Sequence, residues 1–221
     1  MATKIIVSYD GTENDTDGLA FGRLLARAGG SLGLAYVRHT PDAQDGAEAL
    51  LEEGAKLLGN PDVPRHIVVS GSTPDGLRLL AEKEQINVIA FGSEYRTPQG
   101  HVSAGTSAQR LLEGGPIAIA LAPAGLWDRG ELTVTTVAAV SENGDPAPTE
   151  TASSLASALG ATVAPRADSD SSIVVVGSRP GTAAGRVTLS AAAAYLIEMI
   201  RCPVLVLPHG TSIRFGAGPL S

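Results

Sequence analysis

The chain has 221 residues, of which 43% are hydrophobic and 18% charged, a composition typical of globular proteins and not of disordered ones. Its net charge of −7 argues against a nucleic-acid backbone as the main partner, and no apolar run is long enough to span a membrane. The single cysteine, Cys202, cannot form an internal disulfide, which favours a reducing, cytoplasmic location.

The first 125 residues alternate between short apolar runs and helical repeats. Strands are expected at 5–9, 31–37, 64–70, 88–91 and 117–122, with helices at 19–28, 47–58, 73–84 and 108–113. This alternation predicts an α/β fold with a parallel, doubly wound sheet and right-handed crossovers. Ligands of such sheets bind beyond the carboxyl ends of the strands, so Asp10, Val37 and Gly92 are expected to meet at one crevice.

After a linker at 124–130 the pattern restarts in a shortened form. Strands are expected at 132–140, 161–164, 173–176 and 204–207, and helices at 148–158 and 191–199. A helix-strand-helix block corresponding to 47–84 is missing. The sequence therefore predicts two tandem domains, at 1–125 and 131–211, and we expect Trp127 of the linker to be buried between them or at a homodimer contact.

A stretch that follows the fourth strand returns 85 residues later. Across 91–125, ten residues are identical to those 85 positions further on, where chance would give about two. The identities fall mostly at glycine, proline and core positions, so they indicate a duplication. The copies differ where the next helix begins, with Gly-Thr-Ser at 105–107 and Ser-Ala-Ala at 190–192.

The first copy has the residues that a phosphate group would need. Gly92 directly follows a buried strand and lets the backbone approach a ligand. Gly105 opens a helix whose free N–H groups favour an anion, and Thr106 and Ser107 add hydroxyl groups. Arg96 could neutralise the phosphate or close over it. The pattern is equally compatible with an ordinary tight turn, and it is neither a Walker loop nor a dinucleotide fingerprint.

Asp10, at the end of the first strand, is a second candidate. Its carboxylate could accept from an adenine amine or a ribose hydroxyl, or help to hold a metal through water. It could equally cap the following helix or satisfy the turn. Catalytic signatures are lacking, because His39, His66, His101 and His209 do not have metal-ligand spacing and no nucleophile elbow or paired carboxylates are evident. We therefore expect no catalytic residue and no metal site built by the protein alone.

These residues resemble the universal stress proteins, and in particular the tandem members common in actinobacteria. The family's first strand ends in Asp-Gly-Ser, and here the three residues at 10–12 read Asp-Gly-Thr. Its late phosphate motif is Gly-x2-Gly-x9-Gly-[Ser/Thr]. The corresponding columns hold Gly92, Tyr95, Gly105 and Thr106, so a tyrosine replaces the second glycine.

The resemblance covers nearly all of 3–125 and a shortened form of 131–210, and it implies a Rossmann-like, adenine nucleotide alpha hydrolase-like fold in both halves. It further implies an ATP site, with or without magnesium, in the first half. The residues that would line this site are Asp10, Gly11, Thr12 and the backbone near Val37 for adenine and ribose, and Gly92, Arg96, Gly100, Gly105, Thr106 and Ser107 at or beside the phosphates. The degenerate second half is expected to bind no nucleotide.

Family members pair through their last strands, which implies an internal pseudo-dimer of the two halves and is compatible with a homodimer. Three functions remain open. The chain is an ATP-binding switch in stress response or signalling, or it has lost the ligand and serves as an assembly or interaction module in which Tyr95 fills the phosphate region. The third function is weak ATP hydrolysis, for which no general base or nucleophile is evident.

Overall fold

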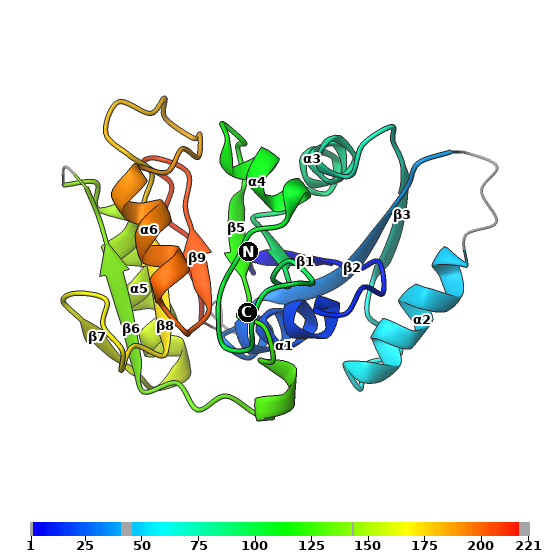
Figure 1. Cartoon of the computed structure of the whole chain (residues 1–221), viewed down its shortest axis with the longest axis horizontal. Helices are drawn as coiled ribbons and strands as arrows, with labels where there is room; N and C mark the ends of the chain where they lie inside the picture. The colour runs from blue at the N-terminus through cyan, green and yellow to red at the C-terminus, as the bar shows by residue number, and fades with distance from the viewer. Residues whose placement is uncertain (1, 41–45, 143, 217–221) are drawn as a thin grey trace.

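A computed structural model describes residues 2–40, 46–142 and 144–216. In it the strands form one continuous sheet with the order β3-β2-β1-β4-β5-β9-β8-β6-β7 (Figure 1). The strands are β1 (Lys4–Ser8), β2 (Ser31–Arg38), β3 (Arg65–Val69), β4 (Val88–Phe91), β5 (Ala118–Leu121), β6 (Thr136–Val140), β7 (Thr162–Ala164), β8 (Ile173–Val176) and β9 (Val204–Val206). The helices are α1 (Asp15–Arg27), α2 (Ala47–Leu57), α3 (Thr73–Glu84), α4 (Thr106–Leu112), α5 (Ala147–Leu159) and α6 (Ala191–Met199), with a 3-10 turn η1 (Trp127–Arg129).

Every neighbouring pair of strands is parallel except β5 and β9, which run antiparallel with Ile119 opposite Val206 and Leu121 opposite Val204. The predicted α/β fold with a mostly parallel sheet is confirmed. This one antiparallel seam divides the sheet into a first half, β1 to β5, and a second half, β6 to β9. The carboxyl ends of the strands therefore lie at opposite edges of the sheet in the two halves.

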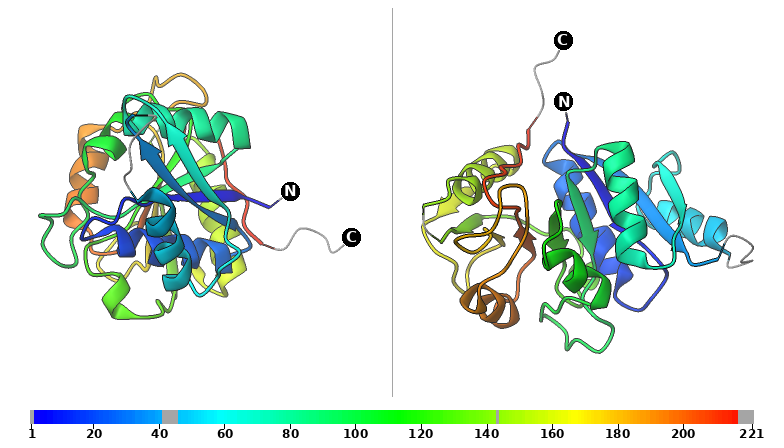
Figure 2. Two further views of the ribbon diagram at one scale, coloured as in Figure 1. Left: turned by 90° about the vertical axis from the view of Figure 1, so that its right-hand side faces the viewer. Right: turned by 90° about the horizontal axis from the view of Figure 1, so that it is seen from above.

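Helices cover both faces of the sheet (Figures 1 and 2). On one face α1, α2 and α5 pack on alternate strand residues through side chains such as Phe21, Leu51 and Leu155. On the other face α3, α4 and α6 do the same through side chains such as Leu77 and Leu111. Aliphatic side chains dominate both cores, since the whole chain has only three Phe and one Trp. Small and branched side chains allow this close packing of helices on buried strands.

Two element boundaries differ from the expected ones. The strand expected from residue 132 begins only at Thr136, because its neighbours start at Thr162 and Ile173 and the preceding residues have no strand to pair with. Helix α1 begins at Asp15, four residues before the expected start. Its polar first turn, which contains Asp15 and Asp17, has no apolar periodicity to reveal it.

The linker packs on the first half. Trp127 is partly buried in the single chain, and the Arg23 guanidinium of α1 lies 5.0 Å from the centroid of its ring. Its burial at a homodimer contact stays a prediction. The buried carboxylate of Asp17 accepts from the backbone N–H groups of Gly125 and Trp127 at 2.8 and 2.7 Å. Burial raises the pKa of Asp17, and these two donors oppose that shift.

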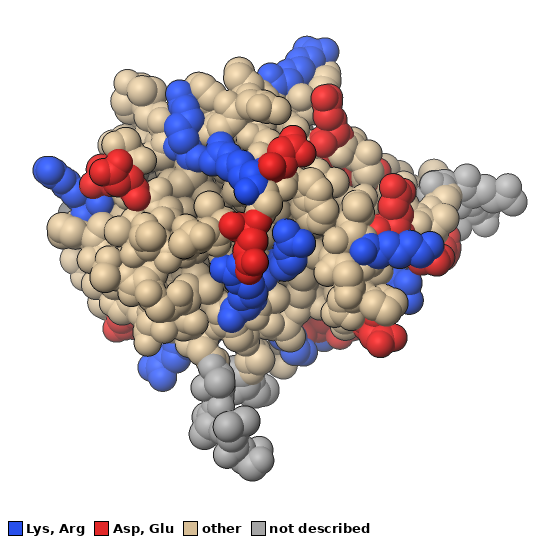
Figure 3. Space-filling view, turned by 90° about the horizontal axis from the view of Figure 1, so that it is seen from below, with Lys and Arg blue, Asp and Glu red and all other residues tan. Residues whose placement is uncertain are grey.

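On the face seen from below, basic and acidic side chains are interspersed among large uncharged areas (Figure 3). Such a mixture produces no extended field of one sign on that face. Within the three described ranges, no helix is both long enough and apolar enough to cross a membrane.

Candidate functional site

A pocket of about 260 Å³ opens at the carboxyl ends of β1 and β4, beside the start of α4. Its lining residues are Ser8, Asp10, Thr12, Asp15, Thr73, Phe91, Gly92, Ser93, Glu94, Tyr95, Gly105, Thr106, Ser107 and Ala108. Six of the ten residues predicted from the sequence are among them. These six come from two connections, β1 to α1 and β4 to α4, and Thr73 comes from a third, between β3 and α3; the parallel strand order brings all three to the same edge of the sheet.

The turn between β1 and α1 is held by Asp15. Its Oδ2 accepts from the backbone N–H groups of Asp10 at 2.6 Å and Gly11 at 2.9 Å, while Asp10 Oδ1 accepts from the N–H of Thr12 at 3.1 Å. Burial, and next the negative charge of Asp10, raise the pKa of Asp15 from 3.8 to about 7, against the lowering effect of the two N–H donors. Two close carboxylates therefore share this corner of the pocket.

The pocket is rich in acceptors. Glu94 joins Asp10 and Asp15 in its lining, and no Lys or Arg does. Arg96 is exposed, with its guanidinium 4.9 Å from the centroid of the Tyr95 ring. These carboxylate oxygens suit the hydroxyl and amine groups of a ligand, or a hydrated divalent cation. A phosphate group without a metal ion would need a positive charge beside it. Among the residues that the structure describes, no group of three or more His, Cys, Asp or Glu could hold a metal alone.

Four predicted residues do not line the pocket. Gly11 forms the turn with a φ of +79°, and Val37 is buried in the core with its side chain against Gly76. Arg96 lies outside on the Tyr95 ring. Gly100, with a φ of +83°, donates its N–H to the Ala124 carbonyl at 2.7 Å and lies beside the linker.

The two glycines of the loop have different reasons to be glycine. A Cβ on Gly92 would lie 1.9 Å from the backbone oxygen of Asn14, so Gly92 serves the close approach of two chain segments, rather than the ligand approach expected for it. A Cβ on Gly105 would meet nothing within 4 Å. Gly105 thus leaves open space at the start of α4, where no side chain caps the helix.

A buried serine organises the loop. Ser93 Oγ donates to the carbonyl of Ala122 at 2.7 Å, lies 3.3 Å from the carbonyl of His101 and accepts from the N–H of Ser103 at 3.1 Å. These bonds tie both ends of the loop to the residue that follows β5. The loop is therefore fixed by its own side chains before any ligand binds.

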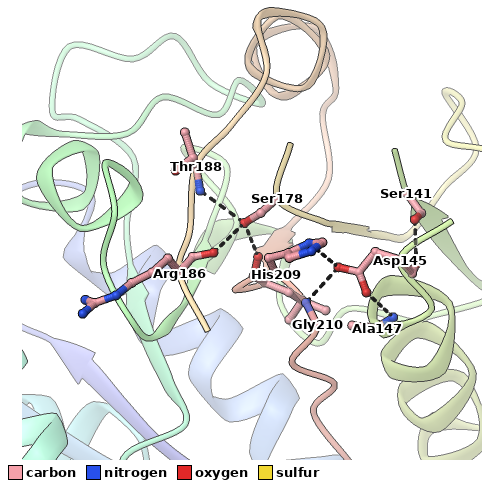
Figure 4. A network of polar contacts seen from close by, with 9 residues as sticks. Ser141, Asp145, Ala147, Ser178, Arg186, Thr188, His209 and Gly210 are labelled. Carbon is pink, nitrogen blue, oxygen red and sulfur yellow. Dashed lines mark hydrogen bonds and ion pairs between the residues drawn. The ribbon is translucent and has the colours of Figure 1, made fainter. Parts of the chain in front are cut away.

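The loop at 177–190 repeats this arrangement (Figure 4). Ser178 Oγ donates to the carbonyl of Leu207 at 2.8 Å, lies 3.1 Å from the carbonyl of Arg186 and accepts from the N–H of Thr188 at 3.2 Å. Each partner lies 85 residues after its counterpart in the first loop. Both loops therefore use the same set of hydrogen bonds around one serine.

The start of α6 differs from that of α4. Ser190 caps α6 by accepting from the N–H of Ala193 at 3.0 Å, and its hydroxyl donates to the carboxylate of Glu142 from the end of β6. A carboxylate of the chain itself therefore lies beside this helix start. Gly105 stands in the corresponding column of the first half and provides neither contact.

A second carboxylate ties the end of the second half together. Asp145 is buried; its Oδ1 accepts from the N–H of Ala147 at 3.0 Å and its Oδ2 from the N–H of Gly210 at 3.0 Å (Figure 4). His209 Nδ1 lies 3.2 Å from Asp145 Oδ2, an ion-pair separation without the angles of a hydrogen bond. Asp17 holds Gly125, the counterpart of Gly210, in the same way.

Cys202 is buried, which raises its pKa to about 11, so it remains a thiol.

Sequence reasoning did not single out Asp15, Thr73 or Glu94. For Asp15 a signal was present, because acidic residues are common in the first turn of a helix. Glu94 lies within the repeated loop and Thr73 starts α3, and neither is marked by a motif. Their place in the pocket depends on which loops the sheet order brings together.

No family model and no curated protein matches this chain. Among solved structures, a putative universal stress protein from Pseudomonas aeruginosa UCBPP-PA14 is similar, with a TM-score of 0.67 and 14% identity over 95% of this chain and 94% of that one. A protein of unknown function from P. aeruginosa PAO1 gives 0.66 and 14%, over 95% and 93%. A universal stress protein from Archaeoglobus fulgidus DSM 4304 gives 0.60 and 12%, over 93% and 98%. Because these likenesses span both halves of the sheet at low identity, they concern architecture: the chain has the fold of the universal stress proteins.

Proposed function

We propose that the chain is a tandem universal stress protein-like module that binds an adenine nucleotide, ATP or a relative of it, through its first half and acts in stress response or signalling. The observation that carries this proposal is the pocket at the ends of β1 and β4. It gathers Asp10 and Thr12 of the first-strand motif with Gly92, Gly105 and Thr106 of the phosphate motif, although the two motifs are distant in sequence.

The polar groups of the pocket divide by the ligand groups that they suit. Asp10 and Thr12 offer acceptors and a hydroxyl for ribose or adenine, and Thr106 and Ser107 offer hydroxyl donors for phosphate oxygens beside the open space at Gly105. Magnesium would offset the repulsion between phosphates and carboxylates, and its preferred ligands are phosphate and carboxylate oxygens. Asp10, or Asp15 beside it, would hold the ion together with the nucleotide.

The second half is proposed to complete the molecule without binding nucleotide. The Glu142 carboxylate lies at the start of α6, where it would repel a phosphate. The antiparallel pairing of β5 with β9 joins the halves as a dimer interface would, which supports an internal pseudo-dimer of domains at 1–125 and 131–211. The described pocket offers no nucleophile with an adjacent base, so any ATP hydrolysis would be slow.

A second candidate is an interaction module without a nucleotide. The pocket volume of about 260 Å³ lies below the ~300–1,000 Å³ usual for ligand sites. Tyr95, at its mouth, is 53% exposed and stands in the column of a motif glycine. These features would suit a protein surface contact through Tyr95 as well as a nucleotide that projects partly into solvent.

Titration calorimetry with ATP, ADP and AMP, with and without magnesium, separates the two candidates. We expect binding of at least one nucleotide at millimolar concentration or below, and loss of at least tenfold in affinity in Gly105→Val, because the new side chain enters the open space beside Thr106. This variant should cost at most about 1 kcal/mol of stability, since φ at Gly105 is an ordinary −67°.

Ala191→Val is the matched control, since it changes the start of α6, where no ligand is proposed. Wild-type affinity is expected for it. Absence of binding by all three nucleotides would exclude the switch and leave the interaction module. ATP turnover is measured on the same proteins, and equal rates in wild type and Gly105→Val would identify a contaminating ATPase.

A further inference from the structure

A cavity of about 650 Å³ lies at the seam between the two halves, with lining residues from both. It is on the face of the sheet that α4 and α6 cover, and Figure 1 shows these two helices. We call it the seam cavity. Its walls come from both halves, and it shares no lining residue with the nucleotide pocket. Its volume falls within the ~300–1,000 Å³ of small-molecule sites. The shortened second half thus supplies one wall of a site that the first half alone does not have.

The lining of the seam cavity is pseudo-symmetric. Ser103 pairs with Thr188, Leu112 with Ile197 and Glu113 with Glu198, each at the offset of 85 residues. The antiparallel pairing of β5 with β9 explains this, because it relates the halves by an approximate twofold axis that passes through the cavity. A ligand of this site would meet a glutamate at both ends, whereas the pairs Gln109 with Ala194 and Ala104 with Leu189 differ between the two halves.

The walls are fixed by main-chain bonds, and small side chains leave the space between them. Gly114, just after α4, donates its N–H to the carbonyl of Val187 at 2.7 Å, and Val187 donates back to Gly115 at 2.8 Å. Ala104 and Ala194 face the cavity where larger residues would fill it. The cavity therefore belongs to a rigid connection between the halves.

Two carboxylates mark the cavity's rim. Glu113 ends α4 and Glu198 lies in the last turn of α6, and because the two helices run antiparallel, these side chains belong to opposite ends. In the described ranges 2–40, 46–142 and 144–216 neither forms an ion pair. The guanidinium groups of Arg186 and Arg201 donate to the main-chain carbonyls of Gly114 and Glu198, and neither side chain lines the cavity.

We propose that the seam cavity binds a molecule that has an apolar body and a cationic group at each end, such as an α,ω-diamine. The apolar wall, which includes Leu112, Leu121 and Ile197, would take the body of the ligand. Glu113 and Glu198 would each take one ammonium group. Because both carboxylates are exposed, each is expected to contribute about two- to fivefold in affinity, and burial of the body contributes the rest.

Binding of probes with the same eight-carbon body but different ends tests the charge preference on the whole chain. Calorimetry should rank 1,8-diaminooctane above 1-aminooctane, and both above decanedioate, whose carboxylates are joined by the same eight methylenes, with at least a tenfold gap between the diamine and the diacid. In Glu113→Gln with Glu198→Gln the diamine should lose its advantage. Equal affinity for diamine and diacid in the wild type, or no binding of either, would overturn the proposal.

The position of the ligand is tested by filling the cavity. Ala194→Trp puts a large ring into it, and Ala192→Trp puts the same ring on the exposed side of the same helix. We expect Ala194→Trp to lower diamine affinity at least tenfold and Ala192→Trp to leave it unchanged. Equal losses in both would overturn the assignment. Should Ala194→Trp fail to fold, Glu113→Gln with Glu198→Gln still decides, because both side chains are exposed and lie outside the core.

Discussion

The loops at 92–105 and 177–190 have the same internal bonds and different surroundings. In both, the hydroxyl of a buried serine contacts two backbone carbonyls and accepts from one N–H. In both, a glycine of positive φ also donates its N–H to a carbonyl beyond the last strand of its half: Gly100 to Ala124, and Gly185 to His209. The residues that the two copies share therefore build the loop itself. A repeat of this kind reports a scaffold, and ligand binding must be judged from the positions where the copies differ.

Those differences are concentrated at the helix that follows each loop. In the first copy, α4 begins after Gly105 without a side-chain cap and beside open space, and Asp10 and Asp15 line the same pocket. The second copy caps its helix with Ser190 and brings in the carboxylate of Glu142. One helix start is left for an external group, and the other is satisfied by the chain.

The largest effect is expected from Gly92→Ala. Its Cβ would stand 1.9 Å from the backbone oxygen of Asn14, and neither backbone segment can yield without moving α1. We expect a loss of about 3 kcal/mol or more in the free energy of unfolding, measured by urea denaturation. Its counterpart, Gly177→Ala, would meet the side-chain ring of Pro148 at 2.7 Å, which can shift, and should cost about 1–2 kcal/mol.

Gly105→Ala is the internal control for this pair, because a Cβ there meets nothing within 4 Å. Its cost should stay below about 1 kcal/mol. A similar loss in Gly92→Ala and Gly105→Ala would contradict the assignment of Gly92 to chain packing and Gly105 to open space.

Ser93→Ala and Ser178→Ala compare the two scaffolds directly. Each removes the hydroxyl that satisfies a buried N–H and a carbonyl, so each should cost about 1–3 kcal/mol in urea denaturation, and the two costs should be similar. Only Ser93→Ala should also weaken nucleotide binding, because Ser93 lines the pocket. If Ser178→Ala weakened it equally, the nucleotide would not be confined to the first half.

The order of elements was predictable because periodicity of apolar residues is a local property. The α/β alternation and the missing block of the second half could be recognised in this way. The boundaries were less predictable, since β6 begins only where β7 and β8 begin beside it. Strand ends depend on partners that are distant in sequence.

The candidate site was predictable where a motif residue also faces the pocket, as Asp10 and Thr106 do. For Asp15 the sequence has the signal of an acidic residue in the first turn of a helix, but nothing that places it in the pocket, and for Glu94 it has no signal. Both roles arise from the packing of three loops. Gly92 and Gly100 show the opposite case, since their glycine character follows from chain contacts. A motif therefore identified the region of the site better than the role of each residue.

The effect of Asp15→Asn depends on the ionisation of one carboxyl group and is measured through its pH dependence. The folded-state pKa of Asp15 is raised from 3.8 to about 7, mainly by burial and then by the charge of Asp10. Between these values the folded chain keeps a proton that the unfolded chain releases, so stability from this group is greatest below pH 4 and falls as the pH rises to 7. The asparagine oxygen can still accept from the N–H groups of Asp10 and Gly11.

Between pH 4 and pH 7 the free energy of unfolding of Asp15→Asn should therefore rise relative to that of the wild type, by an amount on the order of 2 kcal/mol. Urea denaturation at a series of pH values measures this difference. Asp62→Asn, at an exposed turn, is the control and should follow the wild-type pH profile. Parallel profiles for Asp15→Asn and wild type would mean that the carboxylate is ionised at no cost in the folded chain. The corner beside Asp10 would then be well solvated, and its two acids would repel a nucleotide phosphate more strongly than a partly protonated pair does. The pH dependence of Asp15→Asn is therefore the most direct measure of how the pocket is charged.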